Sequence, residues 1–129
     1  LFAEFENYKK KTSKERVDLF KTANKELMIS ILPVKDDFDR AFKEIYKNKN
    51  KSDFEGFILI HNKFNEVLKK NGLLEIEDLI GSSFNSEVHE AISQIPCDKK
   101  DKGKIIEVIE KGYSLGDKII RFPKVIVGN

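Results

Sequence analysis

The sequence predicts an α+β protein, with a helical region at residues 1–72 and a small, mostly antiparallel β domain at residues 73–129. Two observations favour this division. Up to Gly72, apolar residues recur every three or four positions, which is the period of a helix. After Gly72, short runs rich in isoleucine and valine alternate with turn residues, which is typical of strands.

The first element is a long helix expected over residues 1–31. From Val17 onward the spacing of apolar residues alternates between three and four, the pattern of a coiled-coil seam. The predicted seam consists of Val17, Phe20, Asn24, Leu27, Ile31, Val34, Phe38, Ala41 and Ile45. A buried asparagine at position 24 pairs with its symmetry mate only in a parallel, in-register dimer. We therefore expect a parallel homodimeric coiled coil; the alternative is a surface helix that packs within its own chain.

A second helix is expected at about residues 33–48. Pro33 lacks the amide hydrogen that would bond to Ile29, and it disfavours helical geometry at the preceding residue. The sequence therefore predicts a kink or a restart of the helix at Pro33. A loop is expected to follow at residues 48–51.

A third helix is indicated at residues 53–71. Ser52 and Glu55 have the spacing of a capping box, and Asn71 with Gly72 provides a typical helix end. The second and third helices would form an antiparallel hairpin. When a parallel seam doubles this hairpin, the four helices can bury their apolar faces as a four-helix bundle.

The β domain is expected to contain five short strands. They are predicted at residues 73–80, 88–95, 105–109, 119–122 and 124–127. Pro123 lies between the last two and cannot donate a hydrogen bond to a sheet, so we expect it at a bulge or an edge.

The composition argues against partners that are recruited by strong net charge. The chain has 24 basic and 22 acidic residues, so its overall field favours neither nucleic acid nor a membrane surface. The single cysteine, Cys97, rules out an internal disulfide framework, and no apolar run approaches the about 20 residues that cross a bilayer. These features predict a soluble, intracellular chain. Because the sequence begins inside a charged helical pattern, we leave room for a preceding tail or targeting segment.

The sequence lacks the motifs that catalysis or nucleotide binding would need. The chain has two histidines, His61 and His89, with no Gly-x-Ser-x-Gly motif and no metal-ligand spacing to Cys97. Gly103 and Lys104 lack the preceding glycine of a phosphate-binding loop. We therefore expect no enzyme activity, no cofactor and no direct nucleotide binding, with structural roles for both histidines.

Five segments carry a resemblance to a known family. They are AEFENYKKKT (3–12), LPVKDDFDRA (32–41), FNSEVHEAI (84–92), GYSL (112–115) and KIIRFPKVIV (118–127). In this order they resemble the two helical landmarks and the C-terminal signature of the GrpE family, over essentially the whole chain. Two residues depart from that pattern: Ser86 stands where the family usually has proline, and Pro123 where it usually has a small residue.

The resemblance implies a co-chaperone that works by contact with another protein. Such a protein binds the nucleotide-binding domain of a DnaK-type chaperone as a homodimer and accelerates ADP release, after which ATP rebinds and the chaperone releases its substrate. It implies a location in the cytoplasm or in an organelle matrix of bacterial descent. The alternative is a dimeric coiled-coil scaffold or adaptor whose β domain binds some other ligand.

The resemblance also implies which residues contact the chaperone. In the helical region they are Lys9, Lys10 and Gly56, for which the alternatives are a solvated lysine face and either bundle packing or a solvent-exposed glycine. In the β domain they are Phe84, Ser86, Ile109, Lys118 and Val127. Strand alternation alone leaves open whether the apolar members of this second group, Phe84, Ile109 and Val127, are instead core residues.

Overall fold

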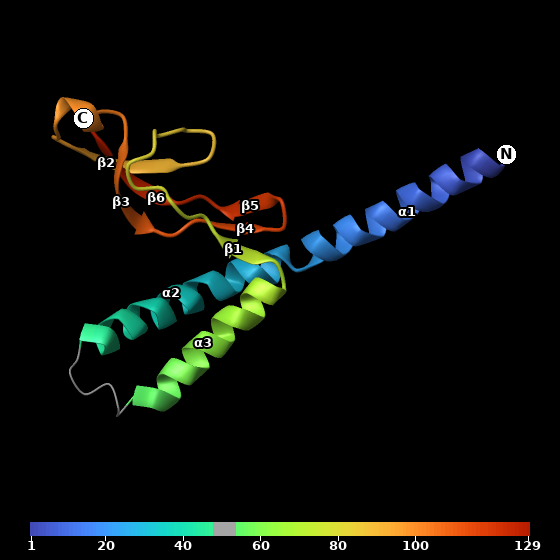
Figure 1. Ribbon diagram of the computed structural model, residues 1–129, viewed down its shortest axis with the longest axis horizontal. Coiled ribbons are helices and arrows are strands. Elements are labelled where there is room, and N and C mark those ends of the chain that lie inside the picture. The colour runs from blue at the N-terminus through green and yellow to red at the C-terminus, as the bar shows by residue number, and fades with distance from the viewer. Residues whose placement is uncertain (48–53) are drawn as a thin grey trace. The chain divides into compact units, whose positions relative to one another are not determined.

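The computed structural model describes residues 1–47 and 54–129, which divide into two compact units at residues 1–65 and 66–129. The elements follow the predicted order, with helices first and strands after them (Figure 1). The α+β class is therefore confirmed. The change from helix to strand occurs between Lys70 and Leu73.

Two helices occupy most of the first unit before the hairpin loop. Helix α1 spans Phe2–Ala23 and helix α2 spans Lys25–Lys47, with the interruption at Asn24. The restart of the helix predicted at Pro33 is wrong, because Pro33 lies inside α2, and the alternative of a kink there stays a prediction. Pro33 is exposed, so the one helical bond that it removes is on a face open to water, whereas the adjacent Leu32 is fully buried. Packing of α2 thus outweighs the cost of the proline.

Asn24 is well suited to its position between the two helices, immediately before α2. Its carbonyl oxygen accepts the amide hydrogen of Met28 at 2.8 Å, the first backbone bond of α2. Asparagine is among the residues most favoured immediately before a helix. The predicted seam is therefore divided, with Val17 and Phe20 on α1 and its later members on α2.

Helix α3 spans Glu55–Lys70 and ends as the sequence predicted. Gly72 adopts a φ of +93°, and its amide donates to the Lys69 carbonyl at 3.0 Å. This left-handed conformation suits glycine at a helix C-terminus. Ser52 of the predicted capping box and the predicted loop at 48–51 lie outside the described residues.

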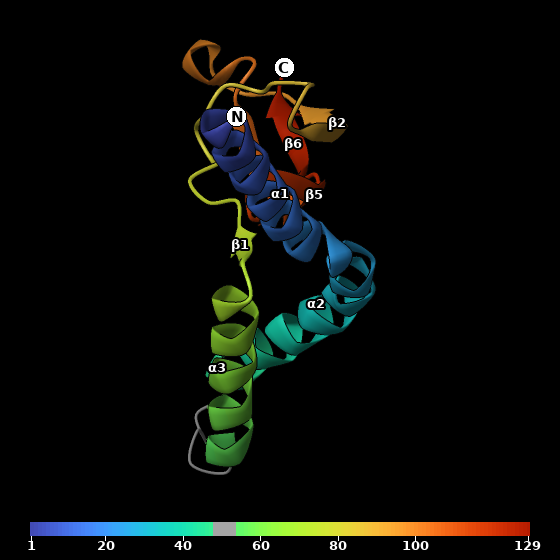
Figure 2. The ribbon, with the colours of Figure 1, turned by 90° about the vertical axis from the view of Figure 1, so that its right-hand side faces the viewer.

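Aromatic side chains join α2 to α3, which run in opposite directions (Figures 1 and 2). The ring of Phe38 lies 5.9 Å from that of Phe57 and 5.4 Å from that of Phe64. Phe42 stacks on His61 at 4.1 Å and lies 4.6 Å from Tyr46. Phe38, a predicted seam residue, therefore already packs within its own hairpin.

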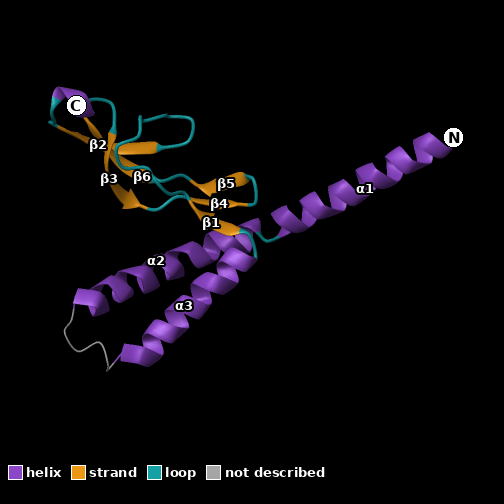
Figure 3. Ribbon diagram, in the orientation of Figure 1, coloured by secondary structure: helices purple, strands orange, loops and turns teal. Residues whose placement is uncertain are grey.

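The second unit contains two three-stranded sheets (Figure 3). The first has the antiparallel order β1-β4-β5, formed by Leu73–Glu75, Tyr113–Leu115 and Lys118–Arg121. The second has the order β2-β6-β3, formed by Glu90–Ile95, Lys124–Gly128 and Ile105–Glu110. In it β6 pairs parallel with β2 and antiparallel with β3. A 3-10 helix at Lys99–Asp101 lies between β2 and β3 in the chain.

Two features of this unit differ from the predicted strands. Strand β1 ends at Glu75, so residues 76–80 of the predicted strand leave the sheet. Their apolar side chains serve the core from an irregular segment: Leu79 is 8% exposed, and Ile76 packs against the same cluster. Strand β4 was not predicted, because it is only three residues long and lies between the turn residues Gly112 and Gly116.

The core of the second unit is small and continuous. It consists of Leu79, Ile105, Val125 and Val127, with Ile76, Phe84 and Val108 packed against it. Three links connect the two sheets: residues 76–89 between β1 and β2, residues 111–112 between β3 and β4, and residues 122–123 between β5 and β6. Gly112 lies in the second link and Pro123 in the third. A β-carbon added to Gly112 would lie 2.6 Å from the Pro123 nitrogen, so only glycine fits there. Pro123 is thus placed between strands of different sheets.

Candidate functional site

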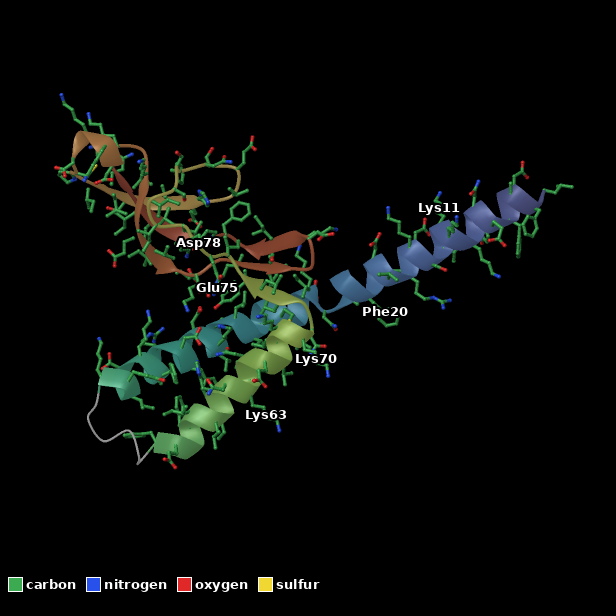
Figure 4. The ribbon with its side chains drawn as sticks, viewed as in Figure 1. Lys11, Phe20, Lys63, Lys70, Glu75 and Asp78 are labelled. Carbon is green, nitrogen blue, oxygen red and sulfur yellow. The ribbon has the colours of Figure 1, made fainter. Side chains whose placement is uncertain are left out.

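The predicted lysines on α1 are exposed to solvent. Lys9 and Lys10 lie on the same helix as Lys11, whose position is labelled in Figure 4. The Lys9 ammonium lies 5.7 Å from the centroid of the Phe5 ring, and Phe5 is itself 58% exposed. This part of α1 therefore presents an aromatic ring and positive charge together, which suits contact with an acidic protein surface.

Gly56 lies in the first turn of α3 and is exposed. A β-carbon added to it meets no atom within 4 Å. Close packing against another segment of the described chain therefore does not explain this glycine. A solvent-exposed position and a contact with a second molecule remain as interpretations.

Two of the five β-domain residues face the core. Val127 is 6% exposed and belongs to the core cluster, which favours the core alternative, while its contact with a partner stays a prediction. Its place on β6 opposite Ile105 explains its burial, because that face of the sheet is covered. Phe84 is half-buried and packs against the same cluster.

The other three β-domain residues are accessible but lie on different elements. Ile109 is 51% exposed on β3, Ser86 is exposed in the turn before β2, and Lys118 is exposed at the start of β5 in the other sheet. No hydrogen bond or ring contact joins these three among the described residues. They are three separate positions on the unit and do not form one cluster.

His89 is held in the loop that carries Phe84 and Ser86. Its Nδ1 accepts the amide hydrogen of Asn85 at 3.0 Å, and its ring lies 5.9 Å from that of Phe84. Desolvation by burial lowers the pKa of His89 below its ordinary value of 6.5. A neutral imidazole is also what the accepted hydrogen bond requires, so His89 orders this loop in its uncharged form.

A network centred on Arg121 was missed in the sequence. Arg121 donates from Nε and Nη2 to the Lys111 carbonyl at 2.9 and 2.6 Å, and it pairs with Glu110 at 3.0 Å. Its guanidinium also lies 5.3 Å from the centroid of the Tyr113 ring. These contacts fix the links between the two sheets. Little in the sequence pointed to this network, because Arg121 lies in a predicted strand and has no feature that sets it apart from an ordinary strand residue.

The same network extends to neighbouring charges. Lys124 pairs with Glu110 at 3.1 Å, and the hydrogen bond and charge of Glu110, followed by the charge of Glu90, raise the pKa of Lys124. Lys111 pairs with Glu75 at 3.1 Å, and Figure 4 labels Glu75 at the end of β1. Glu75, Glu110, Lys111, Arg121 and Lys124 are thus partnered with one another.

His61 forms a buried polar cluster in the α2–α3 hairpin. Its Nε2 lies 2.9 Å from Oδ1 of Asp39 and 3.2 Å from Nδ2 of Asn65, and Asp39 also pairs with Lys35 at 2.8 Å. His61 is 6% exposed and stacks on Phe42. A histidine paired with a carboxylate resembles part of a catalytic dyad, but this one is sealed from substrate. Its burial favours the structural role that the sequence predicts.

Among the described residues there is neither a candidate metal cluster nor a helix that could cross a membrane. Within residues 1–47 and 54–129, no group of three or more His, Cys, Asp or Glu side chains is placed to hold a metal ion. In the same part of the chain, no helix has both the length and the apolar character needed to cross a membrane.

Comparison with known proteins identifies relatives of the whole chain. A sequence profile of the GrpE family matches residues 1–129. A Protein GrpE of Brachyspira hyodysenteriae is 43% identical over 129 residues, which cover 98% of this chain and 64% of that protein. A Protein GrpE of Bacteroides thetaiotaomicron is 44% identical over 130 residues, covering 99% of this chain and 67% of that protein.

The described residues define an α+β protein whose accessible candidate residues suit contact with another protein. The chain belongs to the GrpE family, and the resemblance drawn from its five segments is confirmed. It spans 64% of the Brachyspira relative and 66% of the Protein GrpE of Parabacteroides distasonis, slightly under two thirds of each length.

Proposed function

We propose that this chain is a homodimeric co-chaperone that binds the nucleotide-binding domain of a DnaK-type chaperone and accelerates the release of ADP. ATP then rebinds and the chaperone releases its substrate. The observation that carries the proposal is the family match over all 129 residues. The protein acts in the cytoplasm by protein contact alone, without covalent chemistry, a cofactor or a bound nucleotide of its own.

The accessible candidate residues supply the proposed contacts. They are Lys9 and Lys10 on α1, Gly56 on α3, and Ser86, Ile109 and Lys118 with the half-buried Phe84 in the β unit. Lysines at the rim of an interface mainly raise the rate of encounter and orient the partner. An unobstructed glycine lets a partner approach the helix backbone closely.

Exposed seam residues support the homodimer. Val17, Phe20, Leu27 and Val34 are 51%, 72%, 58% and 49% exposed in the single chain. Apolar side chains that recur at seam spacing are stabilised when a second helix covers them. We infer a parallel dimer in which the α2–α3 hairpins of two chains form a four-helix bundle.

The exchange itself follows from linked binding equilibria. A protein that binds the open, nucleotide-poor form of the chaperone better than the closed form must weaken nucleotide binding by the same factor. Coupling energies of this kind correspond to changes of about 5- to 150-fold in affinity. Tight binding alone produces no exchange, because a ligand with equal affinity for both forms shifts nothing.

Release of fluorescently labelled ADP from a DnaK-type chaperone tests the proposal. We expect faster release in the presence of the purified chain and no ATP hydrolysis by the chain alone. An unchanged release rate would contradict the exchange function. It would favour the rival, a dimeric coiled-coil scaffold whose β unit binds another ligand.

The pair Gly56→Asp and Gly56→Ala tests the site on α3. Asp at an exposed first turn is harmless to a helix, but within an interface it would bury a charge at a cost of several kcal/mol. We expect Gly56→Asp to stay folded and dimeric by circular dichroism and sedimentation while losing most chaperone binding and ADP release. Full activity of that variant would remove Gly56 from the contact surface, and loss of the dimer would place it in the bundle.

A further inference from the structure

The two edges of the sheet β2-β6-β3 differ in their backbone partners. The β3 edge is covered by the segment that precedes β2. Gly81 donates to the Ile105 carbonyl at 2.8 Å, Ile105 donates to the Ser82 carbonyl at 2.9 Å, and Phe84 donates to the Gly103 carbonyl at 2.9 Å. These bonds cover that edge at its start, around residues 103–105.

The β2 edge has no such cover within residues 1–47 and 54–129. β2 is the outermost strand of its sheet, and all six of its residues are exposed. The bonds at its two ends, from Glu90 to the Pro123 carbonyl at 2.9 Å and from Asn129 to the Ile95 carbonyl at 2.8 Å, both run toward the β6 side. The opposite side of β2 therefore offers a row of backbone donors and acceptors to solvent. We call it the outer edge of β2.

The side chains along this edge do not protect it. Native edge strands commonly carry lysine or proline, which discourages pairing with another chain. Residues 91–97 contain no charged side chain, and the only proline, Pro96, lies after the strand. Ile92 and Ile95 are 47% and 36% exposed, so the edge combines unpaired backbone with apolar side chains.

A small excess of positive charge lies at the C-terminal end of β2, where residues 98–102 contain three lysines and two aspartates. Lys99, Lys100 and Lys102 are exposed in and after the 3-10 helix, and we call them the lysine turn. The turn is held at that end of the sheet by Gly128, which pairs with Ile95. A β-carbon added to Gly128 would lie 2.5 Å from the Asp101 carbonyl oxygen.

The other end of the strand does not balance this charge. Glu90, the first residue of β2, lies opposite Lys124 in the sheet and helps to raise the pKa of that lysine. Its negative charge is therefore offset within the chain, whereas none of the recorded ion pairs of the described residues involves the lysine turn. The edge as a whole favours an anionic partner over a second copy of itself.

We propose that the outer edge of β2 binds an extended peptide that carries acidic residues at the end facing the lysine turn. The peptide adds a strand to the sheet through main-chain hydrogen bonds, its apolar side chains contact Ile92 and Ile95, and its carboxylates pair with the lysines. The main-chain bonds supply affinity, and the lysine turn selects the charge and direction of the peptide.

Gln94 provides a test of the backbone contact. The Ile95 carbonyl points toward β6, and backbone groups alternate in direction along a strand, so the amide of Gln94 points outward. Gln94→Pro removes that donor without removing a bond to β6, since proline is tolerated on edge strands. Gln94→Ala keeps the donor and is the matched control.

The experiment measures fluorescence anisotropy of a labelled ten-residue peptide of alternating valine and threonine that ends in three glutamates. Versions with the glutamates at either terminus determine the direction of binding. We expect Gln94→Pro to weaken binding at least about tenfold and Gln94→Ala to change it less than about twofold, the usual span for loss or retention of a main-chain contact. Lys99→Glu combined with Lys100→Glu should weaken binding and reverse the preference toward a peptide that ends in lysines.

Three outcomes would overturn the proposal. The first is absence of binding by both glutamate peptides at low salt. The second is unchanged binding by Gln94→Pro when its amide spectrum shows a folded β unit; if that variant fails to fold, the charge-reversed double variant decides by keeping or losing its preference for glutamate. The third is self-association of the natural chain that Lys99→Glu with Lys100→Glu abolishes and the peptide does not compete with, which would assign the edge to a second copy.

Discussion

The helical unit (residues 1–65) and the β unit (residues 66–129) differ in how far they bury their apolar side chains. In the β unit, Ile105 and Val125 are fully buried and Tyr113 is 1% exposed. In the helical unit, Phe20 is 72% exposed and Leu59 is 69% exposed. The β unit therefore has a core formed within the chain, whereas the helices leave exposed many apolar side chains that the proposed dimer would cover. The stability of the β unit should depend on packing inside the chain. The stability of the helices should depend on formation of the proposed dimer.

Gly112→Ala should lower the free energy of unfolding more than any other change. It tests whether the β unit is too closely packed at this position to accept one added carbon atom. The added β-carbon would lie 2.6 Å from the Pro123 nitrogen, and neither backbone nor proline ring can move aside cheaply. Overpacking of this kind costs about 3 kcal/mol or more. Urea unfolding followed by the amide signals of β6 should show the loss.

Gly56→Ala is the matched control for the same chemical change. Nothing lies within 4 Å of its added β-carbon, so alanine should stabilise α3 by up to about 1 kcal/mol through helix propensity. If both substitutions have the same sign and size, the proposed difference in packing between the two units is contradicted.

Phe20→Ala should have the next largest effect, and it tests the dependence of the helices on assembly. If a partner helix buries Phe20, truncation should cost about 2 kcal/mol per chain. Leu19→Ala is the control, since Leu19 is 66% exposed on the same helix but lies outside the predicted seam. We expect a lower, concentration-dependent thermal midpoint by circular dichroism at 222 nm for Phe20→Ala, with the β-unit amide signals unchanged. A midpoint that is independent of concentration for the natural chain would contradict the dimer.

Lys9→Glu combined with Lys10→Glu should leave both units folded and change only an encounter rate. Exposed charges contribute about 0.2–1 kcal/mol each and are screened by salt. Stopped-flow association with the chaperone should slow, most strongly at low salt, while sedimentation shows the same oligomer. Equal rates for the variant and the natural chain at low salt would make these lysines a solvated face.

His89 should give the smallest effect, a pH dependence confined to the β unit. Its pKa in the folded chain lies below its ordinary value of 6.5, so the unfolded chain binds more protons between these two values. The contribution of His89 to stability is therefore fully present above pH 6.5 and is lost as the pH falls through the folded pKa. Urea unfolding at several pH values should show this loss in the natural chain and not in His89→Gln. A stability that rises as the pH falls through this range would have the wrong sign.

The helical hairpin and most strands could be predicted because their signals are repeated along the chain. Periodic apolar residues indicated α2 and α3, and Gly72 marked the end of α3 correctly. The interruption at Asn24 was missed because the rule for proline pointed to Pro33. That rule counts a lost hydrogen bond and omits the packing of Leu32, which local sequence does not reveal.

The candidate site was harder to predict for a different physical reason. Alternation along a strand says that residues face opposite sides, but it does not say which side is covered. It therefore left open whether Val127, which the resemblance assigned to the contact surface, belongs to the core where the structure places it. Exposure at Ile109 and Lys118 depends likewise on which segments cross each sheet. The Arg121 network could not be predicted, because its partners at positions 110, 111 and 113 reach Arg121 through the pairing of β4 with β5, and strand β4 was not predicted.

The contact between Gly112 and Pro123 has a consequence for how this sequence can diverge. An added β-carbon at 112 would lie 2.6 Å from the backbone nitrogen of residue 123, an atom that every residue at 123 would keep. Replacing the proline therefore does not by itself make room at 112. A lineage that keeps this backbone can change residue 123 on its own, whereas residue 112 can change only after the two links move apart.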